Sequence, residues 1–93
     1  MSKTINLPDG LNRRIPDAYP KIAASAANFN HARDAAMRQH YLEQLRGHAG
    51  ALANTPSDAF RAHGLTADQT VDAVSDHRAA GQQVLALCDA VTI

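Results

Sequence analysis

The stretch TADQTVDAVSDHRAAGQQVLALCDAV, residues 66–91, decides the fold of this chain because it carries the clearest helix signal in the sequence. Thr66 is followed three residues later by Gln69, so the hydroxyl can accept a first-turn backbone N–H while the amide reaches back. Beyond this start, apolar and small residues recur at spacings of four and three, which places them on one helical stripe. The stripe consists of Ala67, Val71, Val74, Arg78, Gly81, Leu85 and Cys88.

Two members of this stripe are unusual for a core helix. Arg78 puts a guanidinium where an apolar side chain is expected, so it either meets a carboxylate inside the protein or lies exposed at an interface. Gly81 is less favourable than Ala in a helix by roughly 1 kcal/mol. We therefore expect at Gly81 either a close crossing with another helix or a break.

The composition limits the core that the rest of the chain can build. The chain has 93 residues, enough for one domain, and 19 of them are Ala, which bury little area but let helices approach closely. Strand-like alternation is nearly absent. The sequence predicts an all-α fold: a small compact bundle of four helices, five if the N-terminal arm is helical, with the arm at residues 1–16 and a single bundle domain at residues 17–93.

The arm combines isolated apolar residues with turn signals around Pro8-Asp9-Gly10. We expect it to pack, with a short helix from Pro8, or else to become ordered on a partner. Its apolar residues are Ile5, Leu7, Leu11 and Ile15.

Capping residues divide the bundle. Asp17 is expected to cap a helix over residues 18–28 and Asn30 a second helix from residue 31 to about residue 46, although one continuous helix through residues 28–30 remains open. Thr55 followed by Pro56 predicts a short helix that ends at His63-Gly64, in a tight corner with the helix of residues 66–91.

The helix expected from residue 31 also shows which of its sides faces inward. Its apolar and small residues recur at heptad spacing, which predicts an inward seam of about two heptads. The seam consists of Ala35, Leu42 and Ala49, with Leu45 and Leu52 on the adjoining row.

Several chemistries are poorly supported. The five His residues show no strong ligand spacing, and the His40/Glu43 pair on one helix face is half of a di-metal motif whose other half is missing. The single Cys88 allows no intramolecular disulfide and lies on the apolar stripe. We expect no catalytic set, no cofactor and no metal site; a small metal-binding helical protein is kept as an alternative.

Charge is uneven along the chain although the formal net charge is zero. The residues 1–50 are net basic and include the pair Arg13-Arg14, whereas residues 51–93 are net acidic. A second alternative is a dimeric DNA-binding transcriptional regulator that gathers its arginines on one surface. The acidic start of the last helix and the zero net charge disfavour nucleic acid as a partner.

Asp68, Asp72 and Asp76 recur every four residues and form an acidic ridge along the last helix. A ridge of this kind is either a solvated face or a docking strip for a basic partner surface. The predicted function is a non-enzymatic helical protein that binds another protein, either a different one or a second copy of itself, as an adaptor or inhibitor of the anti-CRISPR-like kind encoded by phages and mobile elements. The predicted partner-binding residues are Asp68, Asp72, Asp76, Arg78, Arg13 and Arg14.

The start of the chain lacks the apolar run of a signal peptide and no segment is suited to span a membrane, so the expected location is cytoplasmic.

Overall fold

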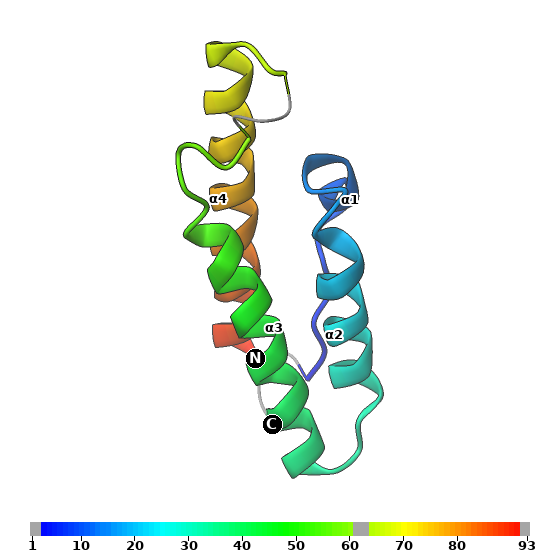
Figure 1. Cartoon of the computed structure of the whole chain (residues 1–93). Helices are drawn as coiled ribbons and strands as arrows, with labels where there is room; N and C mark the ends of the chain where they lie inside the picture. The colour runs from blue at the N-terminus through cyan, green and yellow to red at the C-terminus, as the bar shows by residue number, and fades with distance from the viewer. Residues whose placement is uncertain (1–2, 61–63, 92–93) are drawn as a thin grey trace.

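The structure is a computed structural model that describes residues 3–60 and 64–91. It is an elongated all-α bundle with principal extents of 46 × 20 × 18 Å, which confirms the predicted fold class. The central pairs are α3 with α4 and α2 with α3, while the short α1 lies against α4. The helices of the described residues are α1 (Leu11–Arg14), α2 (Tyr19–His31), α3 (Ala35–Ala53) and α4 (Ala67–Ala90), as Figure 1 shows.

The start of α4 is formed as its sequence predicts. The backbone N–H of Gln69 donates to Thr66 Oγ1 at 3.2 Å, and the backbone N–H of Thr66 donates to Gln69 Oε1 at 3.0 Å. Each side chain thereby satisfies a backbone donor that the first helical turn leaves without an intrahelical partner. From this cap, α4 runs without interruption to Ala90.

Gly81 is the point at which α4 lies closest to α3. A Cβ atom placed on Gly81 would lie 2.4 Å from the backbone nitrogen of Ala53 and 2.5 Å from the carbonyl oxygen of Ala49. Both are backbone atoms of the last turns of α3, so they cannot move aside as a flexible side chain could. Of the two expectations for Gly81, the close crossing is confirmed and the helix break is wrong.

The buried face of α4 differs from the predicted stripe. Three predicted members, Val74, Gly81 and Cys88, are buried, but Ala80 and Val84 are buried as well. The predicted members Ala67, Val71 and Arg78 are exposed, and Leu85 is half-buried. The stripe is wrong in its N-terminal part because α4 begins far beyond the end of α3, where no helix covers it. The additional residues are buried because α4 packs against α1 as well as α3.

The break between α2 and α3 lies later than the predicted one. Asp17 makes no cap, and α2 continues through Asn30 to His31 before the chain turns. Asp34 caps α3 instead, since its Oδ1 accepts the backbone N–H of Ala36 at 3.0 Å. A continuous helix through residues 28–30 into α3 is therefore wrong, and so is the assignment of Asn30 as a cap.

Asn30 instead fixes the N-terminal arm. Its Oδ1 accepts the backbone N–H of Ile5 at 2.7 Å, and its Nδ2 donates to the Ile5 carbonyl at 2.9 Å. Ile5, Leu11 and Ile15 are at most 3% exposed and belong to the main core. The arm therefore packs, as its apolar residues predict, but its helix begins at Leu11 rather than at Pro8.

The predicted helix after Thr55 is not formed in the part of the chain described there. Residues 57–60 form turns, and residues 61–63, including His63, lie outside the described residues. Thr55 does not act as an N-cap: its buried hydroxyl donates to the Leu52 carbonyl at 2.6 Å, at the end of α3. The described residues before α4 therefore supply no helix for the expected two-helix corner.

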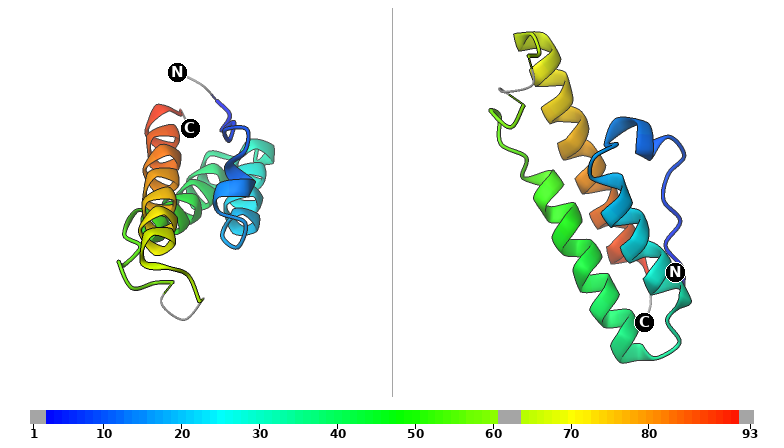
Figure 2. Two further views of the ribbon diagram at one scale, coloured as in Figure 1. Left: turned by 90° about the horizontal axis from the view of Figure 1, so that it is seen from above. Right: turned by 45° about the vertical axis from the view of Figure 1, so that its right-hand side comes forward.

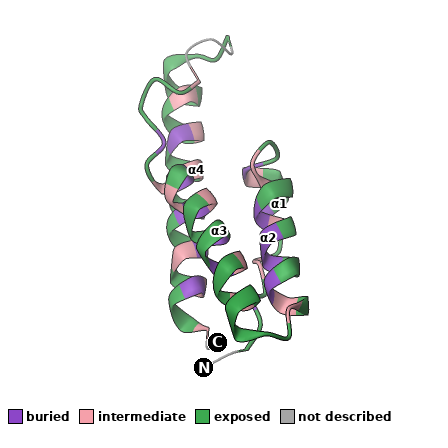
Figure 3. Cartoon of the chain, turned by 60° about the horizontal axis from the view of Figure 1, so that its bottom comes forward, coloured by how far each residue is buried: buried purple, intermediate pink, exposed green. Residues whose placement is uncertain are grey.

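The core lies among the three long helices, away from the first turns of α4. Figure 3 shows buried residues on the facing sides of α2, α3 and α4. On α3 the predicted inward residues Leu42, Leu45, Ala49 and Leu52 are buried, while Ala35 at its start is exposed. Phe29 of α2 is fully buried, and the guanidinium of Arg38 lies 4.1 Å above its ring. Figure 2 shows from two further sides that the first turns of α4 extend past the other helices.

Candidate interaction surface on α4

The N-terminal half of α4 projects beyond the rest of the bundle. Gly81 packs against the last turn of α3, so residues 67–80 run past the end of that helix by about 20 Å at the α-helical rise per residue. The segment that follows α3, the short α1 and the start of α2 are the described parts near it (Figure 1). Much of its surface is therefore left to solvent or to a partner.

The acidic ridge lies on this projecting part. Asp68, Asp72 and Asp76 are all exposed, and the spacing of four places them on one side of α4. Within residues 3–60 and 64–91 the single ion pair joins Arg46 and Asp89 at 2.8 Å, so no described basic group neutralises the ridge. Its carboxylates are available to a basic surface.

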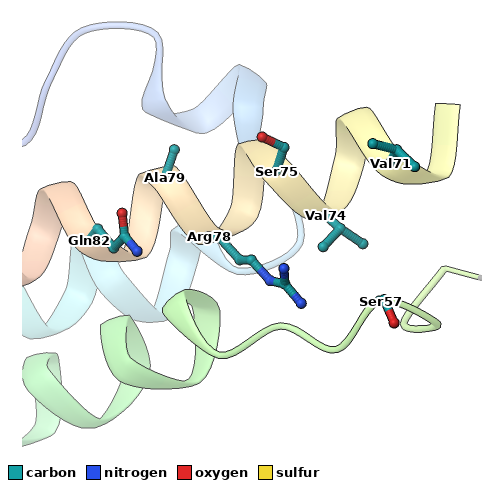
Figure 4. Close-up of a pocket in the computed structure, with 7 residues that line it drawn as sticks. All are labelled: Ser57, Val71, Val74, Ser75, Arg78, Ala79 and Gln82. Atoms are coloured by element: carbon teal, nitrogen blue, oxygen red, sulfur yellow. The ribbon is translucent and has the colours of Figure 1, made fainter. Parts of the chain in front are cut away.

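Val71 is the apolar residue that the projection leaves uncovered. Its side chain is 66% exposed, the highest value among the exposed large hydrophobic residues of the described chain. The sequence pattern placed Val71 inside the bundle, and the structure places it beside a hollow of about 350 Å³. We call this the Arg78 hollow; its lining residues are Ser57, Val71, Val74, Ser75, Arg78, Ala79 and Gln82 (Figure 4).

Arg78 is exposed but held in place. Its Nε donates to the carbonyl oxygen of Thr55 at 2.7 Å, and Figure 4 shows its side chain reaching from α4 toward the segment that carries Ser57. Among the residues described, its two terminal nitrogens have no hydrogen-bond partner. Because the guanidinium is not buried, it needs no carboxylate inside the bundle. It can present its terminal N–H groups to an acceptor on another molecule.

Arg13 and Arg14 lie on α1, and the structure brings one of them to α4. Arg14 Nη1 donates to Gln83 Oε1 at 3.2 Å, while Arg13 is exposed. Gln83 follows Asp76 by seven residues, hence by nearly two helical turns on the same side of α4, about 10 Å away. Arg14 and the acidic ridge therefore share one side of the molecule, whereas Arg78 lies on another side of α4.

The predicted candidates for metal chemistry are not brought together. His40 Nε2 lies 3.3 Å from Gln44 Nε2, and Glu43 accepts from Gln39 Nε2 at 3.1 Å, all on the exposed surface of α3. No group of three or more potential ligands occurs in the described parts of the chain. Cys88 is buried, and burial raises the pKa of its thiol; the nearby Arg46 guanidinium lowers it and the Asp89 carboxylate raises it.

Sequence reasoning did not identify Ser57, Gln82 or the exposure of Val71 as parts of one surface. Helical spacing relates residues of the same helix only, whereas the Arg78 hollow also needs the segment after α3. One signal was present: the last predicted helix was longer than each of its predicted neighbours. A helix that is longer than its neighbours must project from the bundle and leave part of its inner stripe uncovered.

Two further observations bear on the kind of protein this is. None of the described helices has the length and apolar character needed to cross a lipid bilayer. Comparison with protein-family models, with curated proteins and with solved structures finds no match for the chain.

Proposed function

We propose that this chain is a non-enzymatic helical protein that acts by binding another protein through the projecting half of α4. The observation that carries the proposal is the exposure of Val71 on a well-capped helix, between the acidic ridge and Arg78. The residues of a helix that project some 20 Å past its neighbour receive little stabilisation from packing within the bundle. A partner that covers this part would bury apolar surface that the bundle leaves open.

The charges of the surface indicate the chemistry of the partner. Three carboxylates on one side favour a partner that presents Lys or Arg side chains there, and the Arg78 guanidinium favours a carboxylate or carbonyl acceptor near the hollow. Between them, an apolar side chain of the partner would contact Val71. Opposite charges on adjoining sides of one helix also fix the orientation in which a partner can bind.

This proposal includes the finer expectations about the protein's setting. It acts as an adaptor or inhibitor, in the cytoplasm, and belongs to the class of small proteins encoded by phages and mobile elements, of which the anti-CRISPR proteins are one example. The partner is a different protein or a second copy of this chain. The shared side of the acidic ridge and Arg14 supports the second copy, because opposite charges on one side can pair twice across a two-fold axis.

Affinity capture with a matched charge control tests the proposal. The tagged protein is incubated with a lysate of its source organism, and captured proteins are quantified by mass spectrometry. The variant Asp72→Lys/Asp76→Lys should reduce capture of the specific partner, while Asp9→Lys/Glu43→Lys makes the same change in net charge away from α4 and should not. Asp68 is left unchanged because an acidic residue in the first turn stabilises the helix.

Circular dichroism of both double variants shows whether the helices are retained. Light scattering of the purified protein identifies self-association. If the protein self-associates, the dependence of its mean mass on concentration is compared between the same two double variants. Equal capture by the two double variants, with no change in self-association, would refute the proposed surface.

A further inference from the structure

A second and larger hollow lies where the start of α2 meets the end of α3. Its volume is about 480 Å³, and it is formed by three stretches that are distant in sequence: the start of α2, the end of α3 with the segment that follows it, and α4. We call it the His77 hollow; its lining includes Lys21 and Ile22 of α2, His48 and Leu52 of α3, Phe60 of the following segment and His77 of α4. It differs from the Arg78 hollow in every lining residue.

The base of the His77 hollow is apolar. Ile22 is fully buried and Leu52 is 8% exposed, and both belong to the main core, so the hollow ends on the core itself. The rings of Phe60 and His77 form one wall, with centroids 4.8 Å apart and planes tilted by 58°. A base and wall of this kind favour the apolar body of a small molecule, and the volume is within the range of about 300–1,000 Å³ that is typical of such sites.

The His77 side of this wall is attached to α4 by a hydrogen bond. His77 Nδ1 lies 2.8 Å from the carbonyl oxygen of Ala73, and a carbonyl can only accept, so Nδ1 carries the hydrogen. The hydrogen bond fixes the ring against α4, and the contact with Phe60 holds it from the other side. A wall that is ordered before the ligand arrives reduces the entropy lost on binding.

Two nitrogen-bearing side chains at this hollow can serve as hydrogen-bond donors to an acidic head group. Lys21 is exposed and His48 is half-buried, and in the part of the chain that the structure describes neither side chain has a hydrogen bond or an ion pair. The hollow is lined by one carboxylate, that of Asp17, four residues before Lys21. Its oxygens do not lie within ion-pair distance of the Lys21 ammonium. The ammonium and the imidazole therefore remain available to an acidic head group.

We propose that the His77 hollow binds a small amphipathic monocarboxylate. The apolar body of the ligand lies against Ile22, Leu52 and Phe60, and its carboxylate contacts Lys21 and His48. This site is independent of the protein-binding side of α4, because its lining includes no residue of the acidic ridge and neither Arg78 nor Val71.

Sodium decanoate is a suitable probe, used below its critical micelle concentration against the ¹⁵N-labelled full chain. Saturable shifts of amide signals are expected for the residues of the His77 hollow, with small shifts at the acidic ridge. Decyltrimethylammonium has the same chain length and the opposite charge, and it should bind more weakly. Absence of saturable shifts at the hollow, or equal binding of the two probes, would overturn the proposal.

Two matched pairs of variants make the test specific. Lys21→Glu should weaken decanoate binding by about five-fold or more, as expected from the loss of one partly exposed charge contact. Lys3→Glu changes the net charge equally and should leave binding unchanged. Lys21 is in the first turn of α2, where Glu suits the helix dipole, so the variant should fold.

The second pair tests the hollow itself. Ala51 is exposed on α3 and lines the hollow, so Ala51→Trp should fill it and abolish the saturable shifts. Ala24→Trp places the same ring on the exposed side of α2, outside the hollow, and should bind decanoate like the unmodified chain. Decanoate binding that survives Ala51→Trp, or that Lys3→Glu weakens as much as Lys21→Glu does, would contradict the proposed site.

Discussion

Arg78 ties α4 to the segment that follows α3, because its Nε donates to the carbonyl oxygen of Thr55 at 2.7 Å. The next residue of the same helix, His77, bonds to its own helix at the Ala73 carbonyl and contacts Phe60. The segment after α3 is thus held on two sides of α4, one facing the Arg78 hollow and the other facing the His77 hollow. Both candidate sites depend on this attachment.

Arg78→Met should lower the free energy of unfolding by about 1 kcal/mol, which is below the usual range of about 1.5–3 kcal/mol for hydrogen bonds to charged groups because Arg78 is exposed. The Met side chain keeps much of the apolar stem and removes only the donor. The measurement is urea denaturation followed by circular dichroism. Arg33→Met is the control, since Arg33 is exposed and has no hydrogen bond among the described residues. A loss of stability as large for Arg33→Met as for Arg78→Met would show that the Thr55 contact contributes nothing specific.

Two glycine substitutions should change stability in opposite directions. Gly81→Ala places a methyl group 2.4–2.5 Å from backbone atoms of α3, and we expect a loss of about 2 kcal/mol or more despite the better helix propensity of Ala. Gly47→Ala lies in the interior of α3 with nothing within 4 Å of the new atom, so it should gain about 0.5–1 kcal/mol. Thermal or urea denaturation compares them. A Gly81→Ala protein as stable as the unmodified chain would contradict the close crossing of α3 and α4.

Asn30→Ala should release the N-terminal arm. The substitution removes both hydrogen bonds to the backbone of Ile5 and leaves those groups partly buried, at a cost of about 1–3 kcal/mol. Amide hydrogen exchange should show reduced protection of Ile5, with α3 and α4 less affected. Asn28→Ala, at an exposed position of the same helix, should leave Ile5 protected. If Ile5 exchanges equally fast in the unmodified chain, the arm is not anchored through Asn30.

Cys88 should be slow to react with thiol reagents in the folded protein. Burial raises the pKa of its thiol, so the reactive thiolate is scarce and access is limited. The unfolded chain loses its thiol proton at a lower pH than the folded chain, so unfolding becomes more favourable as the pH rises past the unfolded pKa. Stability that Cys88 contributes is therefore present at neutral pH and decreases in alkaline solution. The reactivity is measured by labelling with dithionitrobenzoate, with and without urea. The stability is measured by urea denaturation at neutral and alkaline pH, and in Cys88→Ala the free energy of unfolding should decrease less at alkaline pH.

Local signals in the sequence predicted the helical class and several details correctly. The capping box at Thr66, the inward leucines of α3 and the burial of Cys88 each depend on neighbours within one helix, and spacing alone identifies them. Gly81 was ambiguous because the sequence shows a missing side chain but not what occupies its place. The Ala49 and Ala53 backbone that decides the matter comes from another helix.

The sequence was misleading where a residue typical of an N-cap bonds to another part of the chain instead. Asn30 and Thr55 both have the side chains of N-caps, yet each bonds to a different part of the chain: Asn30 to the arm and Thr55 back to the end of α3. Such long-range or backward bonds are not visible in local patterns. The same applies to the candidate surface, since the acidic ridge is apparent from spacing, whereas the exposure of Val71 follows from where α3 ends.

The most direct test of the protein-binding proposal is site-specific photo-crosslinking from the projecting half of α4. A photoreactive amino acid replaces Val71 in one variant and Gln44, exposed on α3, in the matched control. Both are irradiated in a lysate of the source organism, and products are separated by mass and identified. We predict a discrete crosslinked product from position 71 that is absent from position 44 and is reduced by Asp72→Lys/Asp76→Lys. No discrete product at position 71, or the same products from both positions, would contradict the assignment of this surface as the binding site.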